Sequence, residues 1–107
     1  MIQRSVLLRL HAQARDRRDA IGLECLRLLR SRPMVSSASV AAWSPRLESE
    51  HPGWDLAITV VFVDAAALEA YERDPVHAAF VRDRLAPRVE SRSAFSLELL
   101  DDAADPS

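Results

Sequence analysis

The chain has 107 residues, of which 49% are hydrophobic and 28% are charged, and its formal net charge is −2. This length predicts one globular domain with one hydrophobic core. The small negative charge argues against a nucleic-acid partner, and because all 14 basic residues are arginines, a lysine Schiff base and a phosphate-binding P-loop are excluded.

The cysteine content and the hydrophobic runs indicate where the protein resides. Cys25 is the single cysteine, so an internal disulfide is impossible, which favours a reducing compartment. No apolar run approaches the roughly 18–20 residues of a membrane span, and residues 6–8 are too short for the apolar part of a signal peptide. We therefore expect a cytoplasmic protein with no membrane partner.

The first half of the chain predicts a strand, a helix and a second strand. Residues 2–10 alternate as a strand does, with one face formed by Val6, Leu8 and Leu10. From about residue 17 to residue 31, a helical stripe is formed by Ile21, Cys25, Leu28 and Leu29. Gly22 on this helix can allow close packing against the sheet. Residues 35–43 indicate a second strand, and residues 44–53, with two prolines and a glycine, a loop.

Residues 55–63 give the clearest strand of the chain. One face is formed by Leu56, Ile58, Val60 and Phe62, and the opposite face, interrupted only by Thr59, by Ala57, Val61 and Val63. A strand that is apolar on both faces needs cover on both faces. Because one helical layer covers only one face, we expect a second copy of the chain to cover the other, in a homodimer.

Two short helices and a corner are predicted after this strand. Asp64 can cap a helix over residues 65–72. Pro75 disfavours helical geometry at Asp74, which can then cap a second helix with Pro75 as its first residue. His77 falls in the first turn of that second helix, so its ring and the Tyr71 phenol can converge on the same side of the sheet.

Residues 89–99 complete the pattern with a final half-buried strand, and the acidic residues 101–107 predict a disordered tail. The element order is β-α-β-β-α-β. This order predicts an α+β, ferredoxin-like fold over residues 1–100, with a four-stranded antiparallel sheet, helices on one face and the second helix broken in two.

His77 and Tyr71 are the candidate catalytic residues. An imidazole is a workable general base near neutral pH, and a phenol can donate a hydrogen bond to an oxygen that gains charge. A structural role for His77, and a core role for Tyr71, are the alternatives. His11 and His51 lie in predicted turns without partners at a recognisable spacing, so we expect both to be exposed and expect no metal site.

The sequence resembles the stress-responsive α/β-barrel (Dabb) domain family over nearly its whole length. The resemblance is carried by residues 6–10 (VLLRL), 53–57 (GWDLA), 62–64 (FVD) and 74–77 (DPVH), together with Leu68, Tyr71, Phe80, Val81, Leu85 and Pro87. It implies a dimer of ferredoxin-like subunits that form an α/β barrel. It also implies a pocket between sheet and helices, in which the family's cofactor-free cyclase uses a histidine as base and a tyrosine as donor, matching His77 and Tyr71.

Two departures from that cyclase concern the predicted pocket. The cyclase has pocket histidines at the positions of Arg4 and Leu56, so we do not expect a shared substrate. Arg4 can bind a carboxylate if it faces the pocket; an exposed arginine at the strand end is the alternative. The other residues predicted to bind the substrate are Val6, Leu8, Leu56, Ile58, Val60 and Phe80.

The leading hypothesis is a homodimer with a small apolar pocket that performs cyclase-type or lyase-type proton transfer on a carbonyl, polyketide-like compound, without a cofactor. The first alternative is a non-catalytic, stress-related module for ligand binding or dimerisation. The second is a cofactor-free monooxygenase of the same dimeric ferredoxin-like superfamily.

Overall fold

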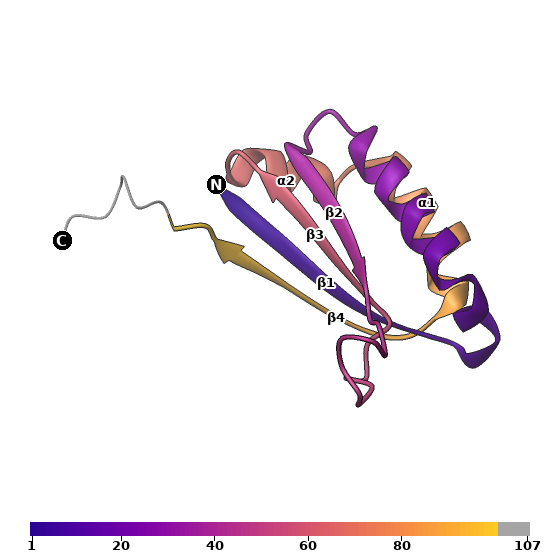
Figure 1. Ribbon diagram of the computed structural model, residues 1–107. Coiled ribbons are helices and arrows are strands. Elements are labelled where there is room, and N and C mark those ends of the chain that lie inside the picture. The colour runs from indigo at the N-terminus through magenta and orange to yellow at the C-terminus, as the bar shows by residue number, and fades with distance from the viewer. Residues whose placement is uncertain (101–107) are drawn as a thin grey trace.

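Four antiparallel strands form one sheet in the computed structural model, which describes residues 1–100 (Figure 1). The strands are β1 (Ile2–Leu10), β2 (Ser37–Ala42), β3 (Leu56–Phe62) and β4 (Val89–Glu98), and their order across the sheet is β2-β3-β1-β4. β1 therefore pairs with both β3 and β4, with Val6 opposite Ile58 on one side and opposite Ala94 on the other. The predicted disordered tail, residues 101–107, lies outside the described residues.

The helices lie on one face of this sheet, as predicted (Figure 1). They are α1 (Arg18–Arg30), α2 (Ala65–Glu72) and α3 (Pro75–Phe80), and α3 packs beside α1. Residues 12–17, predicted as a turn and the start of the helix, form a 3-10 helix instead. None of the helices among residues 1–100 combines the length and the apolar character that crossing a membrane requires.

The predicted corner after β3 is confirmed. The Asp64 carboxylate accepts a hydrogen bond from the Ala67 N–H at 2.9 Å and caps α2. The Asp74 carboxylate accepts one from the Val76 N–H at 3.1 Å and caps α3, which begins at Pro75. After Phe80 the helix widens into a π-helical segment, Val81–Leu85, followed by a 3-10 turn, Ala86–Arg88. The sequence did not predict this widening.

The core lies between the sheet and α1 and is built from the alternating face of β1 and β3. Its buried members are Leu8, Leu10, Ile21, Cys25, Leu29, Leu56, Ile58, Val60, Phe62 and Tyr71. Gly22 allows α1 to approach the sheet closely, as expected. A Cβ at Gly22 would lie 3.2 Å from side-chain atoms of Leu56 and of Val40, closer than most real contacts.

Among residues 1–100, no helix or strand covers the opposite face of the sheet. Phe95 and Leu97 of β4 lie there and are 41% and 52% exposed. They are paired across the ladder with Ser5 and Gln3 of β1. The final strand forms as predicted, and its apolar side chains lie on the face turned away from the helices.

Candidate functional site

Tyr71 and His77 lie together at the corner between α2 and α3. The Tyr71 Oη and His77 Nε2 atoms are 2.7 Å apart, and the two ring centroids are 4.1 Å apart at an interplanar angle of 34°. Tyr71 is buried and also packs against the Phe62 ring at 5.0 Å. The structure therefore brings together the two rings that the corner pattern predicted to converge.

Burial keeps both rings of this pair uncharged at neutral pH. It raises the pKa of Tyr71 to about 12. It also lowers the pKa of His77, and this effect outweighs the charge of Asp74, which acts in the opposite direction. A neutral phenol can donate its O–H to the free lone pair of a neutral imidazole. The pair thus holds a base and a hydrogen-bond donor in the protonation states that acid–base chemistry at pH 7 requires.

Arg32 anchors the corner and was not identified from the sequence. Its Nε donates to Asp74 Oδ2 at 2.6 Å, and its Nη2 donates to Asp74 Oδ1 at 3.1 Å. Asp74 is only 4% exposed, and its pKa is lowered chiefly by the Arg32 hydrogen bond. Because the same carboxylate caps α3, the bidentate pair fixes the helix start that carries His77.

A pocket with a volume of about 660 Å³ opens beside the pair. It lies between β1, β4 and the helices, and its lining includes seven predicted site residues: Arg4, Val6, Leu8, Ile58, Tyr71, His77 and Phe80. The other two predicted residues do not line it. Leu56 lies against Gly22 and borders a smaller hollow of about 240 Å³, and Val60 is 1% exposed within the core. Catalysis by Tyr71 and His77, and substrate binding by the other seven residues, stay predictions.

Other parts of the chain complete the lining in ways that the sequence analysis missed. α1 contributes Cys25, Leu28 and Leu29, the π-helical segment contributes Val81 and Leu85, and the start of β4 contributes a run from Val89 to Arg92. Cys25 is 2% exposed, and burial raises its pKa to about 11, so its thiol stays protonated. The sequence could not predict these lining residues, because they come from three separate elements that meet only in the folded chain.

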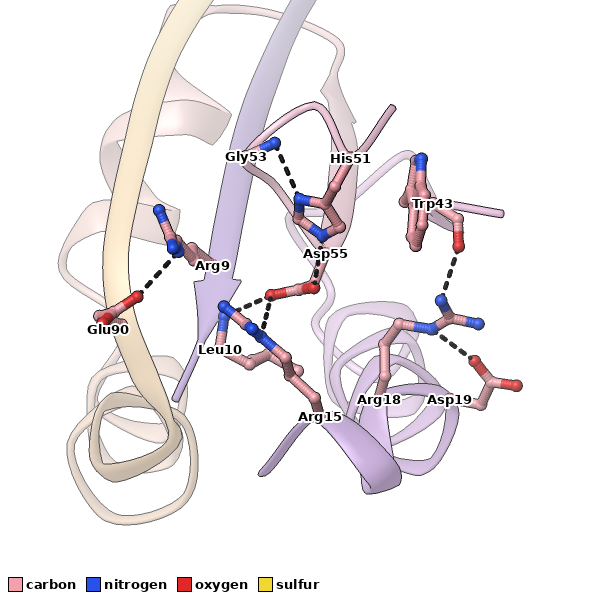
Figure 2. Close-up of polar contacts among 10 residues, drawn as sticks. All are labelled: Arg9, Leu10, Arg15, Arg18, Asp19, Trp43, His51, Gly53, Asp55 and Glu90. Atoms are coloured by element: carbon pink, nitrogen blue, oxygen red, sulfur yellow. Dashed lines mark hydrogen bonds and ion pairs between the residues drawn. The ribbon is translucent and has the colours of Figure 1, made fainter. Parts of the chain in front are cut away.

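A second polar cluster lies at the other end of β3, around Asp55 (Figure 2). Its carboxylate accepts hydrogen bonds from the Leu10 N–H at 2.8 Å and from His51 Nε2 at 3.1 Å, and Arg15 Nε lies 3.6 Å away. The other His51 nitrogen, Nδ1, accepts from the Gly53 N–H at 3.0 Å, so Nε2 carries the ring proton. His51 is exposed, as expected, but the sequence analysis did not recognise Asp55 as its partner.

Asp55 remains ionised although it is only 5% exposed. Burial alone raises its pKa, but the hydrogen bonds from the Leu10 N–H and His51 and the charge of Arg15 outweigh burial and lower it. The Trp43 and His51 rings pack in a T-shaped arrangement, with their centroids 4.6 Å apart. Arg18 Nη1 donates a hydrogen bond to the Trp43 carbonyl at 2.6 Å (Figure 2). This cluster ties the loop before β3 to β1 and α1. No group of three or more potential metal ligands occurs within residues 1–100.

Comparison with known proteins gives one family and a set of similar folds. The family model of the stress responsive A/B barrel domain matches residues 2–99. No curated protein matches the chain significantly. A Dabb family protein of ferredoxin-like fold from Mesorhizobium loti is 25% identical, with a TM-score of 0.74 over 94% of this chain and 97% of the other.

Two further solved structures share the fold at lower identity. A dimeric ferredoxin-like protein of unknown function from Thermobifida fusca is 20% identical, with a TM-score of 0.74 over 92% of this chain and 90% of the other. A hydroxynitrile lyase from Passiflora edulis is 17% identical, with a TM-score of 0.75 over 94% of each chain. At these identities the likeness concerns the fold alone.

Proposed function

The chain belongs to the stress responsive A/B barrel (Dabb) domain family, and from this premise we propose that it is a cofactor-independent enzyme that transfers protons on a carbonyl compound. The observation that carries the proposal is the 2.7 Å contact between Tyr71 Oη and His77 Nε2 at the wall of an accessible, largely apolar pocket. Both rings are neutral, so the imidazole is available as a base without prior loss of a proton.

The proposed reaction begins when a substrate carbonyl oxygen replaces His77 as the acceptor of the Tyr71 O–H. The lone pair on His77 Nε2 is then free and takes a proton from the carbon next to that carbonyl. The electrons of the broken C–H bond form an enolate, whose oxygen is stabilised by the Tyr71 hydrogen bond. In a cyclase-type reaction the enolate carbon attacks a second carbonyl of the same molecule, and the imidazolium returns its proton to the new alkoxide.

The surroundings of Tyr71 and His77 support a role for the pair in proton transfer. Apolar residues such as Ile58, Phe80 and Leu85 line the pocket beside the reacting atoms, and polar interactions are stronger in apolar surroundings than in water. The Arg32–Asp74 contact holds the helix start in place. A ferredoxin-like fold also occurs in the hydroxynitrile lyase from Passiflora edulis, so this architecture is compatible with catalysis.

The experiment measures exchange of α-protons with solvent deuterium in a neutral 1,3-diketone by NMR, with the wild-type protein and with His77→Gln. We expect the wild-type protein to accelerate exchange, and His77→Gln to lose roughly 10²-fold to 10⁴-fold of the acceleration, the usual contribution of a general base. Because burial lowers the pKa of His77, acceleration should persist below the ordinary histidine pKa of about 6.5 and fall at lower pH.

Tyr71→Phe and His51→Gln are the matched controls for this assay. Tyr71→Phe keeps the ring but removes the donor, so it should slow exchange while leaving the base in place. His51→Gln should leave exchange unchanged, because His51 borders no part of the pocket. Equal exchange in wild type and a folded His77→Gln variant would contradict the proposal and leave a non-catalytic ligand-binding domain.

We further propose that the chain forms a homodimer through the uncovered face of the sheet. Phe95 and Leu97 are largely exposed on that face, and the similar protein from Thermobifida fusca is described as dimeric. Light scattering coupled to size exclusion should give twice the mass of the 11.9 kDa chain. A charge on this face, Phe95→Arg, should yield monomers, whereas Arg27→Met on exposed α1 should not. A wild-type monomer at all concentrations would contradict this proposal.

A further inference from the structure

The sheet side of the pocket carries two arginines that form no ion pair within residues 1–100. Arg4 lies on β1 and Arg92 on β4, and both line the pocket. Their positions in the ladder, opposite Ser96 and Leu8 respectively, are four residues apart along β4, or roughly 13 Å. Both lie on the sheet face that the helices cover, because they share the alternation of Val6 and Leu8. Their long side chains can therefore approach one ligand from two sides.

Neither arginine has an acidic partner among residues 1–100. Within residues 1–100, the one side-chain hydrogen bond of Arg4 is donated by Nη1 to Ser96 Oγ at 3.3 Å, and Arg92 makes none. Seven other arginines form ion pairs, namely Arg9, Arg15, Arg18, Arg32, Arg82, Arg84 and Arg88. Most of the five N–H donors of the Arg4 guanidinium are thus available to a bound molecule.

Two acidic residues also line the pocket, and they do not neutralise this pair. Glu90 is bound by Arg9, whose Nε lies 2.8 Å from the Glu90 carboxylate (Figure 2). Glu72 is the last residue of α2 and is exposed to solvent. The charges that act on Tyr71 and His77 also indicate that the two arginines are not neutralised. Burial has the largest effect on the pKa of both rings, but the charges of Arg4 and Arg92 lower the pKa of each, whereas Glu72 and Glu90 are not among the main influences.

We propose that the pocket selects a carbonyl compound that carries a carboxylate, with Arg4 as the residue that binds the carboxylate and Arg92 assisting from the rim. The planar guanidinium of Arg4 can bind both carboxylate oxygens in parallel. The carbonyl group of the same molecule then reaches Tyr71 and His77 on the helical side. This inference rests on the proposed function, because it assigns the substrate class of the same site.

The test is calorimetric binding of two probes that share one carbon skeleton: benzoylbutyrate, an aryl ketone with a terminal carboxylate, and its uncharged methyl ester. We expect the wild-type protein to bind the acid at least about tenfold more tightly than the ester. Arg4→Met keeps the apolar stem but removes the charge. It should weaken binding of the acid by about tenfold to a hundredfold, as expected for the loss of hydrogen bonds to a charged group, and leave binding of the ester unchanged.

Three further variants make the outcome decisive. Arg4→Lys keeps the charge without the paired donors and should lie between wild type and Arg4→Met. Arg92→Met should weaken binding of the acid less than Arg4→Met does. Arg27→Met removes a positive charge from the exposed surface of α1 and should change neither affinity.

The inference fails if the wild-type protein binds acid and ester equally or binds neither probe. It also fails if Arg27→Met weakens binding of the acid as much as Arg4→Met does, or if a folded Arg4→Met variant loses both probes alike. The result is separable from the proposed catalysis. His77→Gln should still bind the acid even though it no longer accelerates proton exchange.

Discussion

Within the part of the chain that the structure describes, two histidines have side-chain partners, and they lie at opposite ends of β3. His51 and Asp55 precede the strand, whereas Tyr71 and His77 follow it. Both ring nitrogens of His51 are engaged, one with Asp55 and one with the Gly53 N–H. Within residues 1–100, the only side-chain hydrogen bond of His77 is the one to Tyr71, and its ring borders a pocket.

The difference separates a structural histidine from one that is available for chemistry. The His51 ring orients a buried carboxylate that closes a loop onto β1, so all of its polar groups already have partners. The Tyr71–His77 pair is neutral and has a single internal bond; a ligand oxygen can replace His77 as the acceptor of the Tyr71 O–H, which frees the His77 lone pair. Accessibility and unused hydrogen-bonding capacity, rather than residue type, therefore distinguish the two sites.

The largest effect on stability should come from Asp55→Ala. This change leaves the buried Leu10 N–H without its acceptor and removes the partner of His51 and Arg15. An unsatisfied buried group costs about 1–3 kcal/mol, so we expect the free energy of unfolding to fall by about 2–3 kcal/mol. Urea denaturation at pH 7 and fixed protein concentration measures the loss.

Asp55→Asn is the control that separates the hydrogen bond from the charge. Its amide oxygen can still accept from Leu10, so we expect roughly half of the loss seen for Asp55→Ala. Proton exchange in the diketone should stay at the wild-type level in both variants, because Asp55 does not line the pocket. A loss of exchange in folded Asp55→Asn would show that the two ends of β3 are coupled. It would contradict the distinction between a structural cluster at Asp55 and a separate site at Tyr71 and His77.

A smaller, pH-dependent effect should distinguish His77. Because burial lowers the pKa of His77, the unfolded chain binds a proton more readily than the folded chain as pH falls through about 6.5. Stability should therefore decrease between pH 7 and pH 5. His77→Gln should flatten this part of the curve. Asp55 affects stability over a different pH range. Because its pKa is lowered, its contribution to the free energy of unfolding is fully present above about pH 4 and is lost only below that pH.

Thermal unfolding across pH 4.5 to 7.5 tests the separation of these pH ranges. His51→Gln is the matched variant, since it removes a histidine from the exposed loop and leaves the surroundings of His77 intact. It should retain the wild-type decrease between pH 7 and pH 5. If His51→Gln flattens the curve and His77→Gln does not, the assignment of the buried, neutral histidine is wrong.

The parts of the fold that could be predicted rest on local chemistry. The alternation of Leu56 through Phe62 follows from the two-residue period of a strand. The caps at Asp64 and Asp74 follow from the hydrogen bonds that the first turn of a helix needs. The Tyr71–His77 contact was also within reach, because the capped corner between them fixes the direction of both short helices.

The missed features depend on contacts between distant residues or on packing. Arg32 and Asp74 are 42 residues apart, and Asp55 meets Leu10 across 45. Val60 and Ile58 lie on the same face of β3, but of these two only Ile58 lines the pocket, whereas Val60 is packed in the core. Periodicity identifies the covered face of a strand and does not tell where along it a pocket opens.

The smallest expected effect is that of His51→Gln on stability. The His51 side chain is 35% exposed, and an ion pair or hydrogen bond at an exposed site contributes about 0.2–1 kcal/mol. Asp55 keeps the Leu10 N–H and Arg15 as partners, so we expect a loss of about 0.5 kcal/mol in the free energy of unfolding, measured by urea denaturation. A loss as large as that of Asp55→Ala would mean that the histidine, rather than the backbone N–H of Leu10, holds the carboxylate in place. The loop would then be a determinant of the fold, instead of a segment tied onto a strand pair that is already formed.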